Sequence, residues 1–198
     1  MQGTTARGLA VTKGHEGDTP RERDREEAGL RSTPRTRHIA DEVELAARAL
    51  ESQGRFGLTR GFIQHGDVSV HAHVLSVSRA SIAMADFLGR AGVRVDRASL
   101  IRGALLHDYF LYDWHDPDPS HRLHGFTHPF AALARAEEDF ELTARERNII
   151  ARHMFPLVPV PPTCREAWIV CLADKACALH ETIAGRLPKR ASNKNRAV

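Results

Sequence analysis

The chain has few cysteines and no long apolar run. Its 198 residues include three cysteines, Cys164, Cys171 and Cys177, and none of them forms a CxxC pair. An odd number of thiols suits neither a disulfide framework nor structural zinc held by thiolates. No segment approaches the roughly 18 consecutive apolar residues of a membrane span, and the N-terminus has no apolar leader. We therefore expect a soluble cytoplasmic protein with reduced thiols and no membrane partner.

The central part of the chain also lacks a concentrated positive charge. The formal net charge is +3, but residues 1–37 carry eight basic and six acidic side chains, and residues 186–198 carry five basic and none acidic. Residues 38–185 therefore sum to −4. Because nucleic-acid binding depends mainly on cationic contacts to phosphates, we expect no specific nucleic-acid binding by this part.

Composition and periodicity predict one helical domain between two tails. Residues 1–37 contain a charge run and almost no apolar periodicity, which predicts a disordered N-terminal tail. Residues 38–187 are long enough for one core, and residues 188–198 form a basic C-terminal tail. No strand pattern or repeat stands out, so we predict an all-α fold of about six main helices.

Capping signals set the expected helix boundaries. A first helix should cover 39–52, and Asp67 or Ser69 should cap a second that runs to residue 88. The other expected starts are Asp96, Pro129 at a first helical position, and two capping boxes, Thr143/Glu146 and Thr163/Glu166. Residues 64–67 and the polar segment 109–125 should be loops, the latter a functional one. The proline-rich segment 156–162 should be extended.

Several histidines and aspartates fall on helix faces that should be buried. His73 lies between Val70 and Val77 on an apolar stripe, although His71 competes for the same role. Taken alone, a histidine there is more often a satisfied core residue. Asp174 lies in the middle of the apolar face of the last helix, where an ionised carboxylate loses several kcal/mol of hydration unless a cation pairs with it.

The other candidates lie near predicted helix ends. The pair His107-Asp108 follows an apolar run, and its acid needs a counter-charge, either a cation or an arginine such as Arg102 or Arg79. His128 precedes Pro129, and His153 occupies the last turn before Pro156. Each of these two could be a helix-end histidine without a further role.

These residues stand in an order that resembles a known family. His73-Val-Leu-Ser-Val77, Ala104-Leu-Leu-His-Asp108 and Leu172-Ala-Asp-Lys175 look like the motifs of the HD superfamily of metal-dependent phosphohydrolases. The first match favours His73 over His71. The segments around His128 and His153 are similar to a bacterial branch of small HD-domain proteins.

The resemblance implies a metal centre within an HD-type helical bundle. His73, His107, Asp108 and Asp174 would bind one divalent ion; His128 and His153 would either hold a second ion, with Asp108 as the bridge, or contact substrate. Mn²⁺ or Fe suits such donors, with Zn²⁺, Mg²⁺, Ni²⁺ and Co²⁺ as alternatives. His107 and Asp108 would be the catalytic residues.

The expected activity is hydrolysis of a phosphomonoester, phosphodiester or nucleotide by a metal-activated water. The substrate would be a small phosphorylated compound, with nucleotides among the candidates. Its contacts are expected at His124, Lys175, Arg79 and Arg122. Two other functions remain open: a di-iron oxygenase on the same scaffold, and a non-catalytic metal- or nucleotide-binding module. A homodimer is compatible with exposed helical faces.

Overall fold

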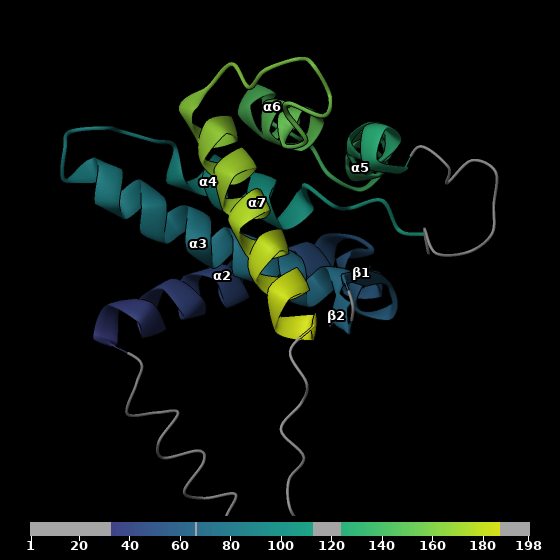
Figure 1. Ribbon diagram of the computed structural model, residues 1–198, viewed down its shortest axis with the longest axis horizontal. Coiled ribbons are helices and arrows are strands. Elements are labelled where there is room, and N and C mark those ends of the chain that lie inside the picture. Colours follow the sequence, from purple (N-terminus) through teal and green to yellow (C-terminus); the bar gives the residue numbers. More distant parts are fainter. Residues whose placement is uncertain (1–32, 66, 113–123, 187–198) are drawn as a thin grey trace, which may run out of the picture. The chain divides into compact units, whose positions relative to one another are not determined.

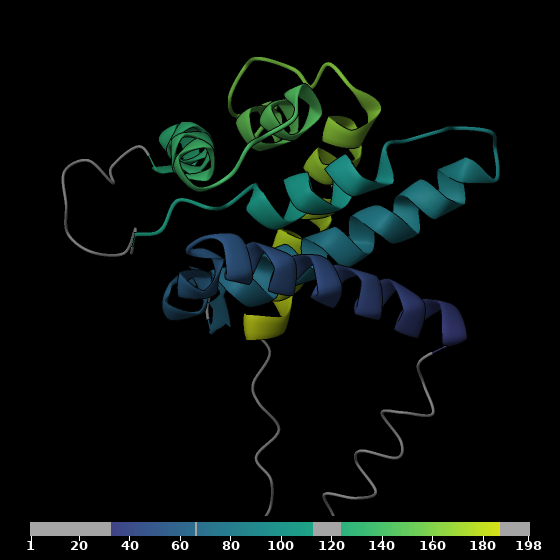
Figure 2. The same ribbon diagram turned by 180° about the vertical axis from the view of Figure 1, so that it is seen from behind.

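The computed structural model describes residues 33–65, 67–112 and 124–186. Helices dominate this part of the chain, as Figure 1 and, from behind, Figure 2 show. They confirm the predicted all-α fold of about six main helices. The α-helices are α2 (Pro34–Gln53), α3 (Val70–Gly89), α4 (Arg97–Leu106), α5 (His124–Asp139), α6 (Ala144–Arg152) and α7 (Arg165–Arg186).

The chain divides into two compact units, Met1–Arg37 and His38–Val198. The described part of the first unit contains the beginning of α2, which starts at Pro34 and so inside the predicted N-terminal tail. Proline suits a first helical position because its missing N–H would have no partner there. The predicted tails otherwise lie outside the described residues, and their disorder stays a prediction.

Within the second unit, α4 is the central helix. It contacts α3, α5, α6 and α7, and α7 also packs along α3 and α6. In Figure 1, α7 crosses in front of α3 and α4. One cluster of buried apolar side chains gathers around Phe56, Tyr109 and Phe110, and a second joins α3, α4, α6 and α7 through residues such as Leu100 and Val170. Burial of this apolar surface is the main stabilising contribution to the fold.

The helix starts follow the capping signals in three cases. Ser69, rather than Asp67, caps α3 by accepting a hydrogen bond from Ala72 N at 3.2 Å. Asp96 caps α4 through Ser99 N. Thr143 and Glu146 form the predicted capping box of α6, with bonds of 3.1 and 2.7 Å.

The fourth and last helices start elsewhere than predicted. α5 begins at His124, so Pro129 lies in its second turn, where it removes a single intrahelical hydrogen bond. α7 begins at Arg165 without the expected box. Thr163 instead pairs with the Asn148 side chain, and Glu166 accepts from Asp96 N at 2.7 Å. Thr163 and Glu166 therefore pair with residues distant in sequence and do not form the local capping box.

Two shorter features also differ from prediction. Residues 63–69, expected in part to be loop, contain an antiparallel pairing of β1 (Ile63–His65) and β2 (Val68–Ser69), preceded by the 3-10 helix η1 (Phe56–Gly61). Strands of two or three residues are too short to show an alternating pattern. The proline-rich segment after α6 forms turns and bends up to residue 160 rather than an extended chain.

None of the helices in the described ranges is long and apolar enough to cross a membrane. The three cysteines are free thiols, as expected.

Candidate metal centre

The structure brings the six predicted donor side chains together in the interior. They come from five segments distant in sequence: α3, the end of α4, α5, the end of α6, and α7. Even the most accessible of them, Asp174, is only 7 % exposed. The donors are His73, His107, Asp108, His128, His153 and Asp174.

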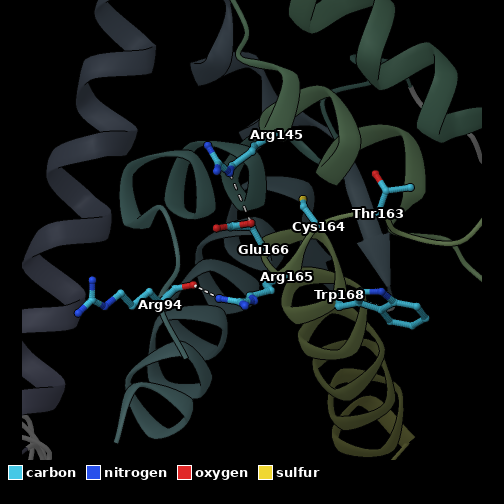
Figure 3. A pocket seen from close by; sticks show the side chains of 7 residues that line it. All are labelled: Arg94, Arg145, Thr163, Cys164, Arg165, Glu166 and Trp168. Atoms are coloured by element: carbon cyan, nitrogen blue, oxygen red, sulfur yellow. Dashed lines mark hydrogen bonds and ion pairs between the residues drawn. The ribbon is translucent and has the colours of Figure 1, made fainter. Parts of the chain in front are cut away.

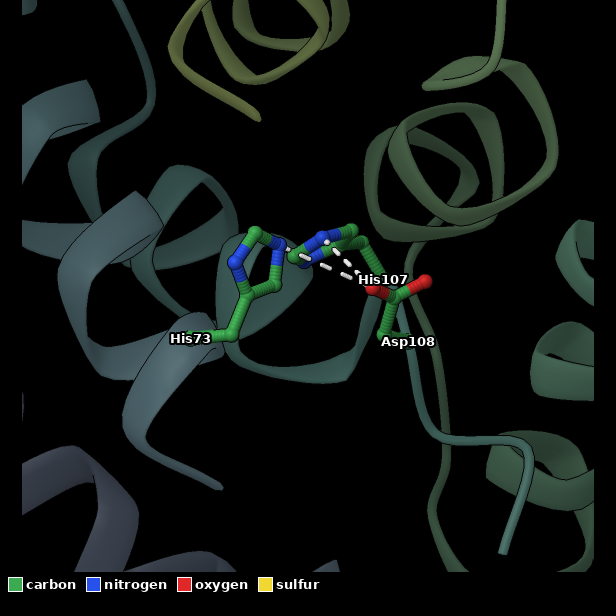
Figure 4. Close-up of side chains that lie close together, drawn as sticks. All are labelled: His73, His107 and Asp108. Carbon is green, nitrogen blue, oxygen red and sulfur yellow. Dashed lines mark ion pairs between the residues drawn. The ribbon is translucent and has the colours of Figure 1, made fainter. Parts of the chain in front are cut away.

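Asp108 lies between two pairs of histidines. Its Oδ2 is 3.3 Å from His107 Nε2 and 3.7 Å from His73 Nε2. Its Oδ1 is 3.2 Å from His128 Nε2 and 3.5 Å from His153 Nε2. Figure 4 shows the first pair with the carboxylate. Each oxygen therefore faces its own pair of imidazole nitrogens.

Asp174 adds a second carboxylate to the His73–His107 pair. Its Oδ1 lies 3.1 Å from His73 Nε2 and 3.6 Å from His107 Nε2. The centre thus has two parts. The first part contains His73, His107, Asp174 and Oδ2 of Asp108; the second contains His128, His153 and Oδ1 of Asp108.

Backbone carbonyls set the proton positions on two of the histidines. His107 Nδ1 donates to Ala104 O at 2.7 Å, and His153 Nδ1 donates to Ile150 O at 2.8 Å. In the neutral rings, Nε2 then carries the lone pair. That of His107 faces the carboxylate oxygens, and that of His153 lies 2.9 Å from His128 Nε2.

This arrangement leaves buried polar atoms without hydrogen bonds. His107 Nε2 and Asp108 Oδ1 are both buried and have no hydrogen-bond partner. While the rings are neutral, the converging lone pairs repel one another, and leaving a buried polar atom unpaired costs about 1–3 kcal/mol. A cation removes both penalties, so the residues present fit a divalent metal.

The charges of the centre depend strongly on one another. Burial opposes a charge on His73, but hydrogen bonds to Asp174 and Glu181 raise its pKa to about 9. Burial likewise opposes a charge on His107, yet Asp108 and Asp174 raise its pKa well above the ordinary value.

The pKa values of Asp108, Asp174 and His153 shift in the opposite direction. Burial disfavours ionised Asp108 and Asp174, but the facing histidines, His107 foremost, hold both carboxyl pKa values below the usual range. Burial lowers the pKa of His153. Protonated imidazoles therefore balance the carboxylates where a metal would otherwise do so.

Two polar residues of the centre were not predicted. Gln64, on β1, is buried and donates through Nε2 to Asp108 Oδ2 at 2.7 Å. Glu181, on α7, lies with Oε2 2.9 Å from His73 Nδ1. The sequence predicts a loop at Gln64, and the structure places this residue on a strand. Glu181 could have been found from its position two helical turns after Asp174, which places it on the same helix face.

The competing residue His71 lies away from the donors. Its ring packs against Phe56, and its Nδ1 pairs with Thr59 Oγ1 at 3.1 Å. The arginines weighed as partners for Asp108 are also engaged elsewhere: Arg79 pairs with Glu44 at 2.8 Å, and Arg102 lies 3.5 Å from Glu146. Neither of these two arginines therefore forms the salt bridge to Asp108.

The structure gives little information about the residues predicted to contact the substrate. Lys175 donates to His153 O at 2.8 Å, so its ammonium group ties α7 to the end of α6. Arg79 is engaged by Glu44, as described above. Arg122 and the side chain of His124 lie outside what the structure describes, and their roles stay predictions.

A separate cavity of about 420 Å³ opens at the start of α7 and contains none of the six donors. Figure 3 shows partners for three of its charged groups: Arg145 lies near Glu166, and Arg165 donates to the Arg94 carbonyl. The lining residues are Arg94, Arg145, Thr163, Cys164, Arg165, Glu166 and Trp168.

The helical fold and the buried donor set define an all-α protein with a histidine–carboxylate centre suited to divalent metals. Comparison with protein families matches residues 70–179, more than half of the chain, to the HD domain. The chain belongs to the HD domain family. No curated protein and no solved structure matches it.

Proposed function

We propose that this protein is a metal-dependent phosphohydrolase whose centre holds two divalent ions. The observation that carries the proposal is the position of Asp108 between two histidine pairs, with buried lone pairs on both sides. The HD domain family is generally hydrolytic, which supports the reaction class.

Each part of the centre would hold one ion. His73, His107 and Asp174 would bind the first together with Oδ2 of Asp108. His128 and His153 would bind the second together with Oδ1. Bound divalent ions lower the pKa of a coordinated water and polarise a phosphoryl oxygen.

The protein's own residues orient the ligands of the centre. Ala104 O and Ile150 O hold two imidazoles through Nδ1, and Gln64 holds the shared carboxylate. The second part offers three protein ligands and the first offers four, so the second leaves more coordination positions for water and substrate. We propose a small phosphorylated substrate, with nucleotides as the first class to test.

A substrate panel with an aspartate variant tests this function. Purified protein loaded with Mn²⁺ or Fe²⁺ should release phosphate or a nucleotide from at least one phosphomonoester, phosphodiester or nucleotide. Asp108→Ala should lose at least about 100-fold in kcat/KM, because it removes the group shared by both ions. Asp41→Ala, an exposed change on α2, is the matched control and should keep full activity.

The same panel distinguishes the alternative functions. Phosphate release under anaerobic conditions supports the hydrolase. Turnover that consumes O₂ and does not occur under anaerobic conditions would contradict the hydrolase and favour the oxygenase. Metal binding without any turnover would favour the binding module.

A further inference from the structure

Glu181 contacts the centre from the side of His73 that faces away from the other donors. Its Oε2 lies 2.9 Å from His73 Nδ1, while Asp174 Oδ1 lies 3.1 Å from Nε2 of the same ring. The two acids are seven residues apart on α7, which places them on one helix face. One helix therefore holds both nitrogens of His73 with two carboxylates.

Glu181 takes the place that a backbone carbonyl has at two other histidines. Nδ1 of His107 and of His153 each donate to a carbonyl three residues earlier in the chain, Ala104 O and Ile150 O. Both of those histidines end a helix, where the carbonyls of the last turn are free. His73 lies in the first turn of α3, so its nearest helical carbonyls are not available in that way. It needs an acceptor from another element.

We propose that Glu181 is a positioning residue of the metal centre. Its carboxylate accepts the Nδ1 proton of His73, holds the ring in one orientation and leaves Nε2 as the ligand atom. The inference rests on the proposed metal centre and extends it to a residue that coordinates no ion.

The negative charge of Glu181 gives this contact an effect that a carbonyl lacks. A carboxylate acceptor polarises the imidazole and makes Nε2 a stronger donor to a cation. The side chain of Glu181 is only 10 % exposed, so solvent screens this interaction little. His73 should consequently be among the strongest ligands of the first part.

Three variants test the role of Glu181 through metal affinity. Glu181→Ala removes the acceptor, and loss of such an outer partner typically weakens metal binding about 10–100-fold. Glu181→Gln keeps an acceptor oxygen without the charge and should recover part of that loss. His180→Ala, an exposed change next to it on α7, is the matched control and should bind as the parent does. Calorimetric titration with Mn²⁺ measures all four proteins.

A second measurement reports the proton position directly. In protein loaded with Zn²⁺, ¹⁵N NMR of the His73 ring should show a protonated Nδ1 in the parent and in Glu181→Gln. Faster exchange of the Nδ1 proton with water in Glu181→Ala would support the proposal: Zn²⁺ on Nε2 keeps Nδ1 protonated in every variant, so the variants differ only in whether that proton has an acceptor.

Parent-like affinity in Glu181→Ala, or an Nδ1 without a proton in the parent, would overturn the role of Glu181 and leave the metal centre intact. A parent protein that binds no metal would overturn the proposed function as well. The two failures are therefore distinguishable.

Discussion

Asp108 and His73 show how single side chains determine the chemistry of this centre. Asp108 uses both oxygens, one toward each histidine pair, while Gln64 holds one of them through an amide hydrogen bond. His73 has a carboxylate on each ring nitrogen. Because these groups are buried, any change in their charge alters the free energy of folding as well as metal affinity.

The first prediction concerns the pH dependence of the metal-free protein. The pKa of His73 is raised from 6.5 to about 9, so its proton stabilises the fold fully below pH 6.5, and this stabilisation is lost as the pH rises through 9. The pKa of His107 is raised as well. The free energy of unfolding should fall between pH 6.5 and 9 by an amount on the order of 1–3 kcal/mol.

Thermal unfolding with and without chelator measures this effect. In the metal-loaded protein the cations take the place of the protons, so Tm should not fall over the same range. If the Tm of the metal-free protein, measured with chelator, stays level or increases from pH 6.5 to 9, the imidazoles do not carry the positive charge that balances the carboxylates.

At the scale of elements, the close packing of α4 against α6 holds the two parts of the centre together. The His107-Asp108 pair directly follows the last residue of α4, and His153 directly follows the last residue of α6. A Cβ added at Gly103 of α4 would collide with the Ile149 side chain of α6. Glycine at this position permits the close approach of the two helices.

Gly103→Ala should therefore force the two helices apart. Overpacking of this kind typically costs about 1–3 kcal/mol in the free energy of unfolding, more than alanine gains in helix propensity. The displacement should also weaken the second metal position, which depends on His153. Denaturant unfolding and metal titration measure both effects. Gly89→Ala, which has open space around it at the end of α3, is the matched control, and equal stability of the two variants would contradict the packing argument.

The elements also show what the sequence could and could not predict. Helical spacing placed His73 and Asp174 on buried faces because a long amphipathic helix repeats its pattern over several turns. It could not locate Gln64, because the strand that carries this residue is too short to have a pattern. The predicted Thr163/Glu166 capping box does not form for another reason: Thr163 and Glu166 pair instead with Asn148 and Asp96, which are distant in sequence. The resemblance to the HD superfamily implied that the donors meet at Asp108. Their distances from its two oxygens are defined only by the three-dimensional structure.

At the scale of the whole molecule, the centre exists only in the folded chain. His73 and Asp174 are 101 residues apart in sequence, and the remaining donors come from three further segments. An unfolded chain offers no such site, so metal binding should stabilise the fold. A buried histidine–carboxylate centre formed by five segments is thus both the proposed site of chemistry and a link between the helices.

Metal content per chain tests the central claim most directly. Protein stripped with chelator, saturated with Mn²⁺ and freed of unbound ions should contain two ions per chain by elemental analysis. His153→Ala should retain one, because it removes a ligand of the second part only. A parent protein that binds a single ion, or none, would contradict the account of Asp108 as a carboxylate shared between two metals.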